Sequence, residues 1–181
     1  MHPGKASNPR RKRPASPGSS TLKNSEPSSP ERAFQDALKL LAPRDYTSAK
    51  MRERLARRGF DEAAIEEAVA RLEGQGWLSD RRFAERFAEM AVNGGRFFGP
   101  RLRLEMRRHG VPAELVEETL GRLRQERDEQ DDLRSVMERR YPGFSFAAAD
   151  DREKRRVIAF LQRRGFGLGA IMKILKVEEI Y

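Results

Sequence analysis

Residues 51–69, 102–120 and 157–175 form three stretches of equal length that align without a gap: MRERLARRGFDEAAIEEAV, LRLEMRRHGVPAELVEETL and VIAFLQRRGFGLGAIMKIL. Each stretch carries a glycine at the same position, and these are Gly59, Gly110 and Gly165. Apolar residues stand eight and four positions before each glycine and one, six and ten positions after it. A spacing of four follows one face of a helix, and glycine is common where a helix ends in a left-handed turn. The pattern therefore predicts a helix, a glycine turn and a second helix, three times over.

A further helix is expected before each of these pairs, over residues 31–42, 79–93 and about 129–140. Ser79 and Asp80 are favourable types for a helix N-cap, and no alternating stretch indicates a strand. The sequence thus predicts an all-α protein of nine helices in three tandem three-helix repeats, covering residues 31–78, 79–127 and 128–181. Repeats of this size pack mainly against their neighbours, so we expect an elongated, curved molecule with a long surface and no deep pocket.

The charge of the chain is unevenly distributed. There are 37 Lys and Arg residues against 28 Asp and Glu, a net charge of +9. Residues 1–30 carry a net +5 together with six prolines and seven serines, which predicts a disordered basic tail. Residues 31–150 are neutral, and residues 151–176 carry a net +6. The basic stretch of residues 151–176 favours an anionic partner.

Few residues are suited to catalysis or to holding a metal ion. The chain has no cysteine, and its two histidines, His2 and His109, have no partner at metal-ligand spacing. The GxGxG run at 165–169 follows a helix, which does not fit a dinucleotide fold. The acidic residues of 128–132 either hold a hard cation or begin the seventh helix in solvent, and we favour the second. We therefore expect no enzyme activity, no cofactor and no metal.

The location expected from the sequence is the cytoplasm. No apolar run is long enough to span a membrane, and the basic N-terminus is not followed by the apolar stretch of a secretory signal. The lack of cysteine is in keeping with a reducing compartment.

Basic residues at two kinds of position are the candidate contacts for a partner protein or nucleic acid. Those that precede the repeated glycines are Arg57, Arg58, Arg107, Arg108, Arg163 and Arg164. The negative end of a helix explains part of this placement. It does not explain the basic residues at the start of a helix, which are Arg152, Lys154, Arg155 and Arg156.

Three aromatic residues near the junctions between repeats have a structural interpretation. We expect Trp77 to pack between repeats and Phe97 and Phe98 to lie in the core. In the sequence, aromatic residues do not interleave with the basic ones as stacking on a single strand would require.

Ordered motifs from all three repeats resemble the RecX family of bacterial recombination regulators over about residues 33–176. The matching motifs are Leu40-Leu41, Arg44-Asp45-Tyr46-Thr47, Gly59-Phe60, Gly76-Trp77-Leu78-Ser79-Asp80, Phe98-Gly99-Pro100, Leu104-Glu105-Met106, Gly110-Val111, Phe160-Leu161 and Arg164-Gly165-Phe166. One departure is Asn93-Gly94-Gly95-Arg96, where a more basic stretch is expected.

The resemblance implies a monomeric modulator of the RecA recombinase, acting in DNA repair and the SOS response. Its partners would be RecA and the RecA–single-stranded-DNA filament, with weak direct DNA binding as an additional contact. Family members usually suppress strand exchange, ATP hydrolysis and coprotease activity. The alternatives are a helix-turn-helix transcriptional regulator and a structural adaptor. The mixed charges of exposed helix faces, such as Glu66 and Arg71, count against reading of a DNA groove.

Overall fold

The computed structural model describes residues 29–177, and over this range the chain is entirely helical. The helices are α1 (Pro30–Leu41), α2 (Ser48–Ala56), α3 (Glu62–Gly74), α4 (Asp80–Asn93), α5 (Gly99–Arg108), α6 (Ala113–Glu126), α7 (Glu129–Arg140), α8 (Asp151–Arg164) and α9 (Leu168–Val177). Residues 1–28 of the predicted basic tail lie outside the described range, whereas Pro30 begins α1. None of the nine described helices has the length and apolar character needed to cross a membrane.

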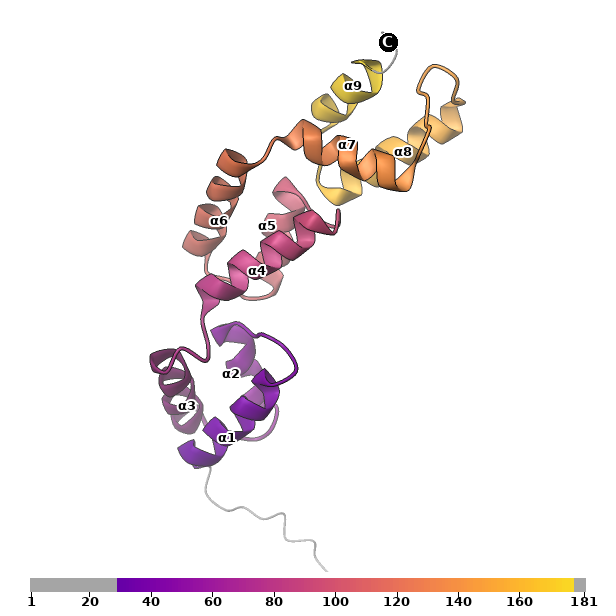
Figure 1. Cartoon of the computed structure of the whole chain (residues 1–181). Helices are drawn as coiled ribbons and strands as arrows, with labels where there is room; N and C mark the ends of the chain where they lie inside the picture. The colour runs from indigo at the N-terminus through magenta and orange to yellow at the C-terminus, as the bar shows by residue number, and fades with distance from the viewer. Residues whose placement is uncertain (1–28, 178–181) are drawn as a thin grey trace, which may run out of the picture.

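Consecutive helices form three groups that follow one another along a bent, elongated molecule (Figure 1). We call them the first module (α1–α3), the second module (α4–α6) and the third module (α7–α9). In each module the first and last helices pack together, and the second helix packs against the last. The prediction of an all-α protein built from tandem three-helix repeats is confirmed.

The repeated glycines end the second helix of each module in the same way. Gly59, Gly110 and Gly165 all have positive φ, at 87°, 79° and 108°. The amide after each glycine donates to the carbonyl five residues earlier, from Phe60 to Leu55, Val111 to Met106 and Phe166 to Leu161. This pattern belongs to the Schellman motif, in which apolar residues at these two positions also touch. The aligned apolar residues are therefore required by the turn as well as by the core.

Several helices begin at the N-cap residues that the sequence indicates. Ser79 caps α4, and Asp61 accepts a 2.8 Å hydrogen bond from the amide of Ala64 at the start of α3. Asp128 caps α7, and Asp132 pairs with Arg127 at 2.5 Å. The acidic residues of 128–132 thus begin a helix, as favoured from the sequence.

The buried side chains form two separate cores. One lies within the first module and includes Met51, Leu55 and Leu72. The other runs through the second and third modules without a break and includes Leu102 and Leu161. The molecule is therefore divided into two packed bodies, although its sequence repeats three times.

The junction between the second and third modules joins backbone to backbone. The amide of Phe98 donates to the carbonyl of Arg164 at 2.8 Å, and the rings of Phe98 and Phe166 stack with their centroids 4.3 Å apart. A side chain on Gly165 would overlap the carbonyl oxygen of Phe98. Phe98 is buried as predicted, and Phe97 packs against the same core while remaining partly exposed.

The junction between the first and second modules is polar. The hydroxyl of Thr47 donates to the carbonyl of His109 at 2.6 Å, and the amide of Ser48 donates to Asp80 at 2.7 Å. Both Thr47 and Ser48 are buried. Nearby, Arg86 forms a 3.0 Å ion pair with Asp45. Directional hydrogen bonds thus take the place of the apolar contacts found at the other junction.

Replacing Thr47 with valine should destabilise the first junction by about 1–3 kcal/mol, because the carbonyl of His109 loses its donor and α2 loses its cap. The hydroxyl also accepts a hydrogen bond from the amide of Lys50 at 3.2 Å. The matched control is Thr119→Val, since Thr119 is equally buried but donates only to Leu115 of its own helix. Urea denaturation followed by circular dichroism measures both variants. Equal losses of stability in the two variants would contradict a role for Thr47 in joining the first module to the second.

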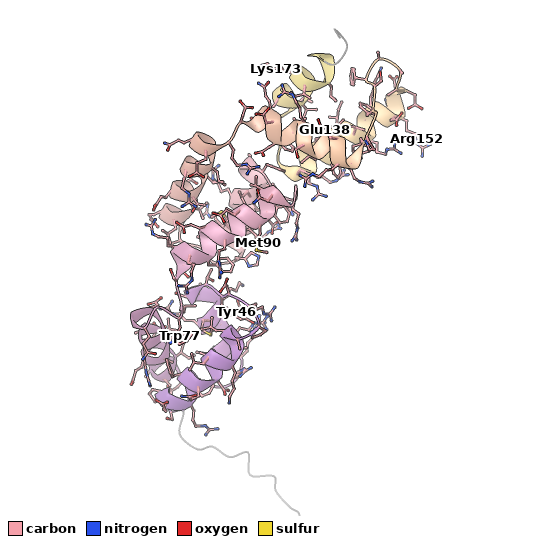
Figure 2. The ribbon with its side chains drawn as sticks, viewed as in Figure 1. Tyr46, Trp77, Met90, Glu138, Arg152 and Lys173 are labelled. Atoms are coloured by element: carbon pink, nitrogen blue, oxygen red, sulfur yellow. The ribbon has the colours of Figure 1, made fainter. Side chains whose placement is uncertain are left out.

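The structure corrects the prediction for Trp77. Its side chain is 58% exposed, whereas the neighbouring Leu78 is 3% exposed and belongs to the first core. Arg82 donates hydrogen bonds to the carbonyls of Gly76 and Trp77, which fixes the backbone here. Trp77 therefore lies on the surface beside the first junction and does not fill it (Figure 2).

Candidate partner-binding surface

Many charged side chains of the first two modules form ion pairs within their own module. Arg52 bonds both carboxylate oxygens of Glu66, at 2.7 and 3.0 Å, and Arg103 does the same with Glu117, at 2.7 and 2.8 Å. The hydrogen bond from Arg52 holds the pKa of Glu66 below its usual value. These two pairs occupy equivalent positions in the repeat. In the third module the same positions hold Ile158 and Met172, so this neutralising pair is missing there.

Several of the basic residues before the repeated glycines are already paired. Arg57 bonds Glu53, Arg58 bonds Asp36 at 3.0 Å, and Arg108 bonds Glu105 at 3.0 Å. Arg107 and Arg163 are exposed and have no carboxylate partner within residues 29–177. Three of the six predicted residues at these positions are therefore engaged in ion pairs, which the sequence interpretation by helix dipoles did not include.

The basic residues at the start of α8 are much less neutralised. We call Arg152, Lys154, Arg155 and Arg156 the α8 cluster. Arg156 bonds Glu153 at 3.3 Å, and Lys154 lies 4.9 Å from the centroid of the Phe146 ring. Neither Arg152 nor Arg155 has an ion pair in the described part of the chain. Arg152 lies at the far end of the molecule from Trp77 (Figure 2).

The structure does not gather all ten predicted residues on one surface. Arg57 lies by the first junction, where it lines a cleft with His109, whereas Arg152 projects from the third module. The candidate surface is therefore extended, and most of its residues without an ion pair in the described range are in the third module.

His109, in the cleft at the first junction, has a lowered pKa. Contact with the rings of Phe83 and Phe87 removes water from the imidazole, which disfavours its charged form. The charge of Lys50 lowers the pKa further, and the charge of Glu105 opposes the shift.

Two arginines of this surface were missed in the sequence. Arg139 and Arg140 end α7 and lie with Arg164 around one small cleft. The only sequence signal is a basic pair at a helix end, but Tyr141-Pro142 follows it instead of glycine. Basic and aromatic side chains also meet in space although they do not alternate in sequence. Arg164, for example, lies 4.9 Å from the centroid of the Phe160 ring.

The described residues show no metal-binding group. No three His, Asp or Glu side chains gather in a way suited to a metal ion within residues 29–177. In the acidic stretch 128–132, Asp128 caps α7, and Asp131 and Asp132 each form an ion pair with an arginine.

Family models match each of the three modules in order. The first three-helix domain of RecX matches residues 33–72, the second matches residues 79–120 and the third matches residues 127–175. The chain belongs to the RecX family. Its membership confirms the resemblance carried by the junction and glycine motifs.

Relatives in the RecX family extend over nearly the same length. The chain is 42% identical over 147 residues to the regulatory protein RecX of Trichlorobacter lovleyi, covering 81% of this chain and 96% of that protein. It is 36% identical over 146 residues to the regulatory protein RecX of Syntrophotalea carbinolica, covering 81% and 95%. A regulatory role of the RecX type follows from these matches.

A solved structure has the same fold. The crystal structure of RecX from Lactobacillus salivarius superposes with a TM-score of 0.64, at 18% sequence identity, and the match covers 84% of this chain and 97% of that one. The three-module RecX architecture is therefore retained at low sequence identity.

Proposed function

We propose that this RecX-family protein regulates homologous recombination by binding the RecA–DNA filament and lowering RecA activity. It acts as a non-enzymatic cytoplasmic monomer, with module boundaries at residues 78/79 and 127/128. The observation that carries the proposal is the α8 cluster, a group of basic side chains at the end of an elongated molecule, of which Arg156 alone has an ion pair within residues 29–177. An anionic, extended assembly is a complementary partner for such a surface.

The α8 cluster contacts acidic RecA surface or DNA phosphate in this proposal. Within residues 29–177, Arg152 and Arg155 have no ion pair to lose on binding, and Arg156 has only an exposed one. Exposed charges at the rim of an interface act chiefly on the rate of association and make it sensitive to salt. The choice of RecA as the partner rests on the family resemblance. The choice of the α8 cluster as the contact region rests on the distribution of charge.

The purified protein should lower the single-stranded-DNA-dependent ATP turnover of RecA. Changing Arg152, Arg155 and Arg156 together to glutamate should raise the concentration for half-inhibition by about tenfold, taking roughly 0.5 kcal/mol per exposed charge. The control is the triple change of Arg124, Arg134 and Lys173 to glutamate, which alters the net charge equally on exposed positions outside the cluster. Both variants are measured with a coupled ATPase assay. No inhibition by excess wild-type protein would refute the proposal.

A pull-down with RecA, with and without single-stranded DNA and nucleotide, tests the partner directly. Retention that needs RecA supports the proposal, and retention by duplex DNA with a sequence preference supports a transcriptional regulator instead. Retention by neither, at low salt as well, supports the structural adaptor.

A further inference from the structure

Three arginines surround a cleft at the junction between the second and third modules. Arg139 and Arg140 come from the end of α7, and Arg164 comes from the end of α8. The cleft has a volume of about 160 Å³, and its walls include Gly95, Val136 and Phe160. No carboxylate lines it. Three like charges at one cleft without a neutralising group are energetically unfavourable, so a bound anion would stabilise them.

Two of the three guanidinium groups are held in place by backbone carbonyls. Arg139 donates to the carbonyl of Asn93 at 3.0 Å and to that of Ser135 at 3.1 Å. Arg164 donates to the carbonyl of Arg96 at 3.2 Å and lies over the ring of Phe160. Because a guanidinium has five N–H donors, both retain donors for a ligand. Their positions are thus fixed before any ligand binds.

The turn between α4 and α5 allows Arg139 to approach closely. Gly95 is buried and has a φ of 63°, and a Cβ at this position would lie 3.0 Å from Nη2 of Arg139 and 3.2 Å from Val136. A larger residue there would displace Arg139 from the cleft. The Gly94-Gly95 pair, which departs from the basic stretch expected in the family, therefore makes room for a basic side chain from another module.

Helix-end electrostatics account for only part of this arrangement. The C-terminal ends of α7 and α8 each carry about half a negative charge, which leaves roughly two positive charges at the cleft. A phosphate group carries up to two negative charges and offers several oxygen acceptors to planar guanidinium donors. A carboxylate has one charge and two oxygens, so it would leave one arginine without a partner.

We propose that Arg139, Arg140 and Arg164 form a phosphate-binding site between the second and third modules. The ligand is a phosphate group that can carry two negative charges, either free or as the terminal phosphomonoester of a nucleic acid. The cleft is too small for a whole nucleotide and takes the phosphate alone. This inference goes beyond the proposed function, because the site binds phosphate whether or not the protein binds RecA.

The first test uses the full protein and inorganic phosphate, with sodium chloride at equal ionic strength as the reference. Phosphate should shift the NMR signals of the Nε–H groups of Arg139, Arg140 and Arg164 in a saturable manner, and chloride should not. The double variant Arg139→Gln with Arg140→Gln should weaken phosphate binding at least about tenfold, since it removes two charge-assisted contacts. The control Arg124→Gln removes an exposed, unpaired arginine outside the cleft and should change the affinity less than about twofold.

Substitution of Arg139 also removes two structural hydrogen bonds, so the single variant Arg140→Gln provides a second test. Arg140 has no hydrogen bond or ion pair among residues 29–177 and lies 5.6 Å from the centroid of the Tyr141 ring, so its loss should leave the unfolding transition unchanged. It should still weaken phosphate binding severalfold. An equal loss of phosphate affinity in the Arg140→Gln and Arg124→Gln variants would refute a defined site.

Two further probes distinguish the source of the phosphate. A short 5′-phosphorylated oligothymidylate that shifts the same three signals more strongly than inorganic phosphate identifies the end of a nucleic acid, whereas a response to inorganic phosphate alone identifies a free ion. Both results support the site. Preferential binding of an oligo-aspartate peptide to the same arginines, or no saturable shift with phosphate, would overturn it.

Discussion

Replacing Gly165 with alanine should destabilise the second core by about 4 kcal/mol or more. The positive φ of 108° accounts for roughly 1–2 kcal/mol of strain, since an alanine rarely adopts it. The new methyl group would also overlap the carbonyl of Phe98 and approach the Cβ of Arg101 to 2.9 Å. Because the first obstacle is backbone, relief requires the junction to open and the bond from Phe98 to Arg164 to lengthen. Destabilisation above 4 kcal/mol is characteristic of such a defined clash.

The equivalent glycines provide the controls for this substitution. A Cβ on Gly59 would meet no atom within 4 Å, so Gly59→Ala should cost only the strain of its φ, about 1 kcal/mol. Gly110→Ala should be intermediate, because its methyl would approach the Cβ of Ala49 to 2.8 Å at the first junction. Thermal and urea unfolding give the three values. A uniform cost at the three sites would show that conformational strain alone matters and that the second junction is not tightly packed.

The substitutions Leu55→Ala and Leu161→Ala should each cost about 2–5 kcal/mol but affect different unfolding transitions. Both side chains are fully buried at the same repeat position, so similar cavities result. Leu55 lies in the first core and Leu161 in the second. Each substitution should therefore lower the transition of its own core, because the buried apolar residues form two separate clusters and the junction between them is held by polar bonds.

Two optical signals separate these transitions. The fluorescence of Trp77, the only tryptophan, reports on the connection that follows the first core, while far-ultraviolet circular dichroism reports on all helices. In Leu55→Ala the fluorescence transition should come before most of the loss of helix, and in Leu161→Ala the order should reverse. Coincident transitions in both variants would mean that the molecule unfolds as one cooperative unit.

Most of the fold could be predicted because local and long-range requirements coincide at the same residues. Leu55, Met106 and Leu161 are apolar both for the turn that ends each helix and for the core that it enters. The division into two cores could not be predicted in this way. It depends on whether the second helix of a module begins with a hydroxyl that donates to the next module, as at Thr47, or with an apolar ring, as at Phe98.

The exposure of Trp77 illustrates a second limit. Gly76, with a φ of 72°, ends α3, and the amides of Trp77 and Leu78 then both donate to the carbonyl of Leu72. This tight turn points Leu78 inward and Trp77 outward. The sequence shows two adjacent apolar residues, and helical periodicity does not extend through the turn to distinguish them.

The candidate surface was predicted only in part for a related reason. The α8 cluster could be found because basic residues at a helix start oppose the helix dipole. The association of Arg139 and Arg140 with Arg164 depends on the packing of α7 beside α8 and on the close approach of Gly95. Residues 24 or more positions apart in the chain meet there, and no local pattern records it.

The division into two cores has a mechanical consequence. The second and third modules share one core, whereas their attachment to the first module is the connection at residues 75–79 together with the polar bonds of the first junction. A rotation about this connection would have to break those few bonds but no apolar core. Such a rotation moves the second and third modules together as a lever, and the displacement grows with distance from Gly76. The α8 cluster, at the far end, would therefore travel furthest while both cores stay intact.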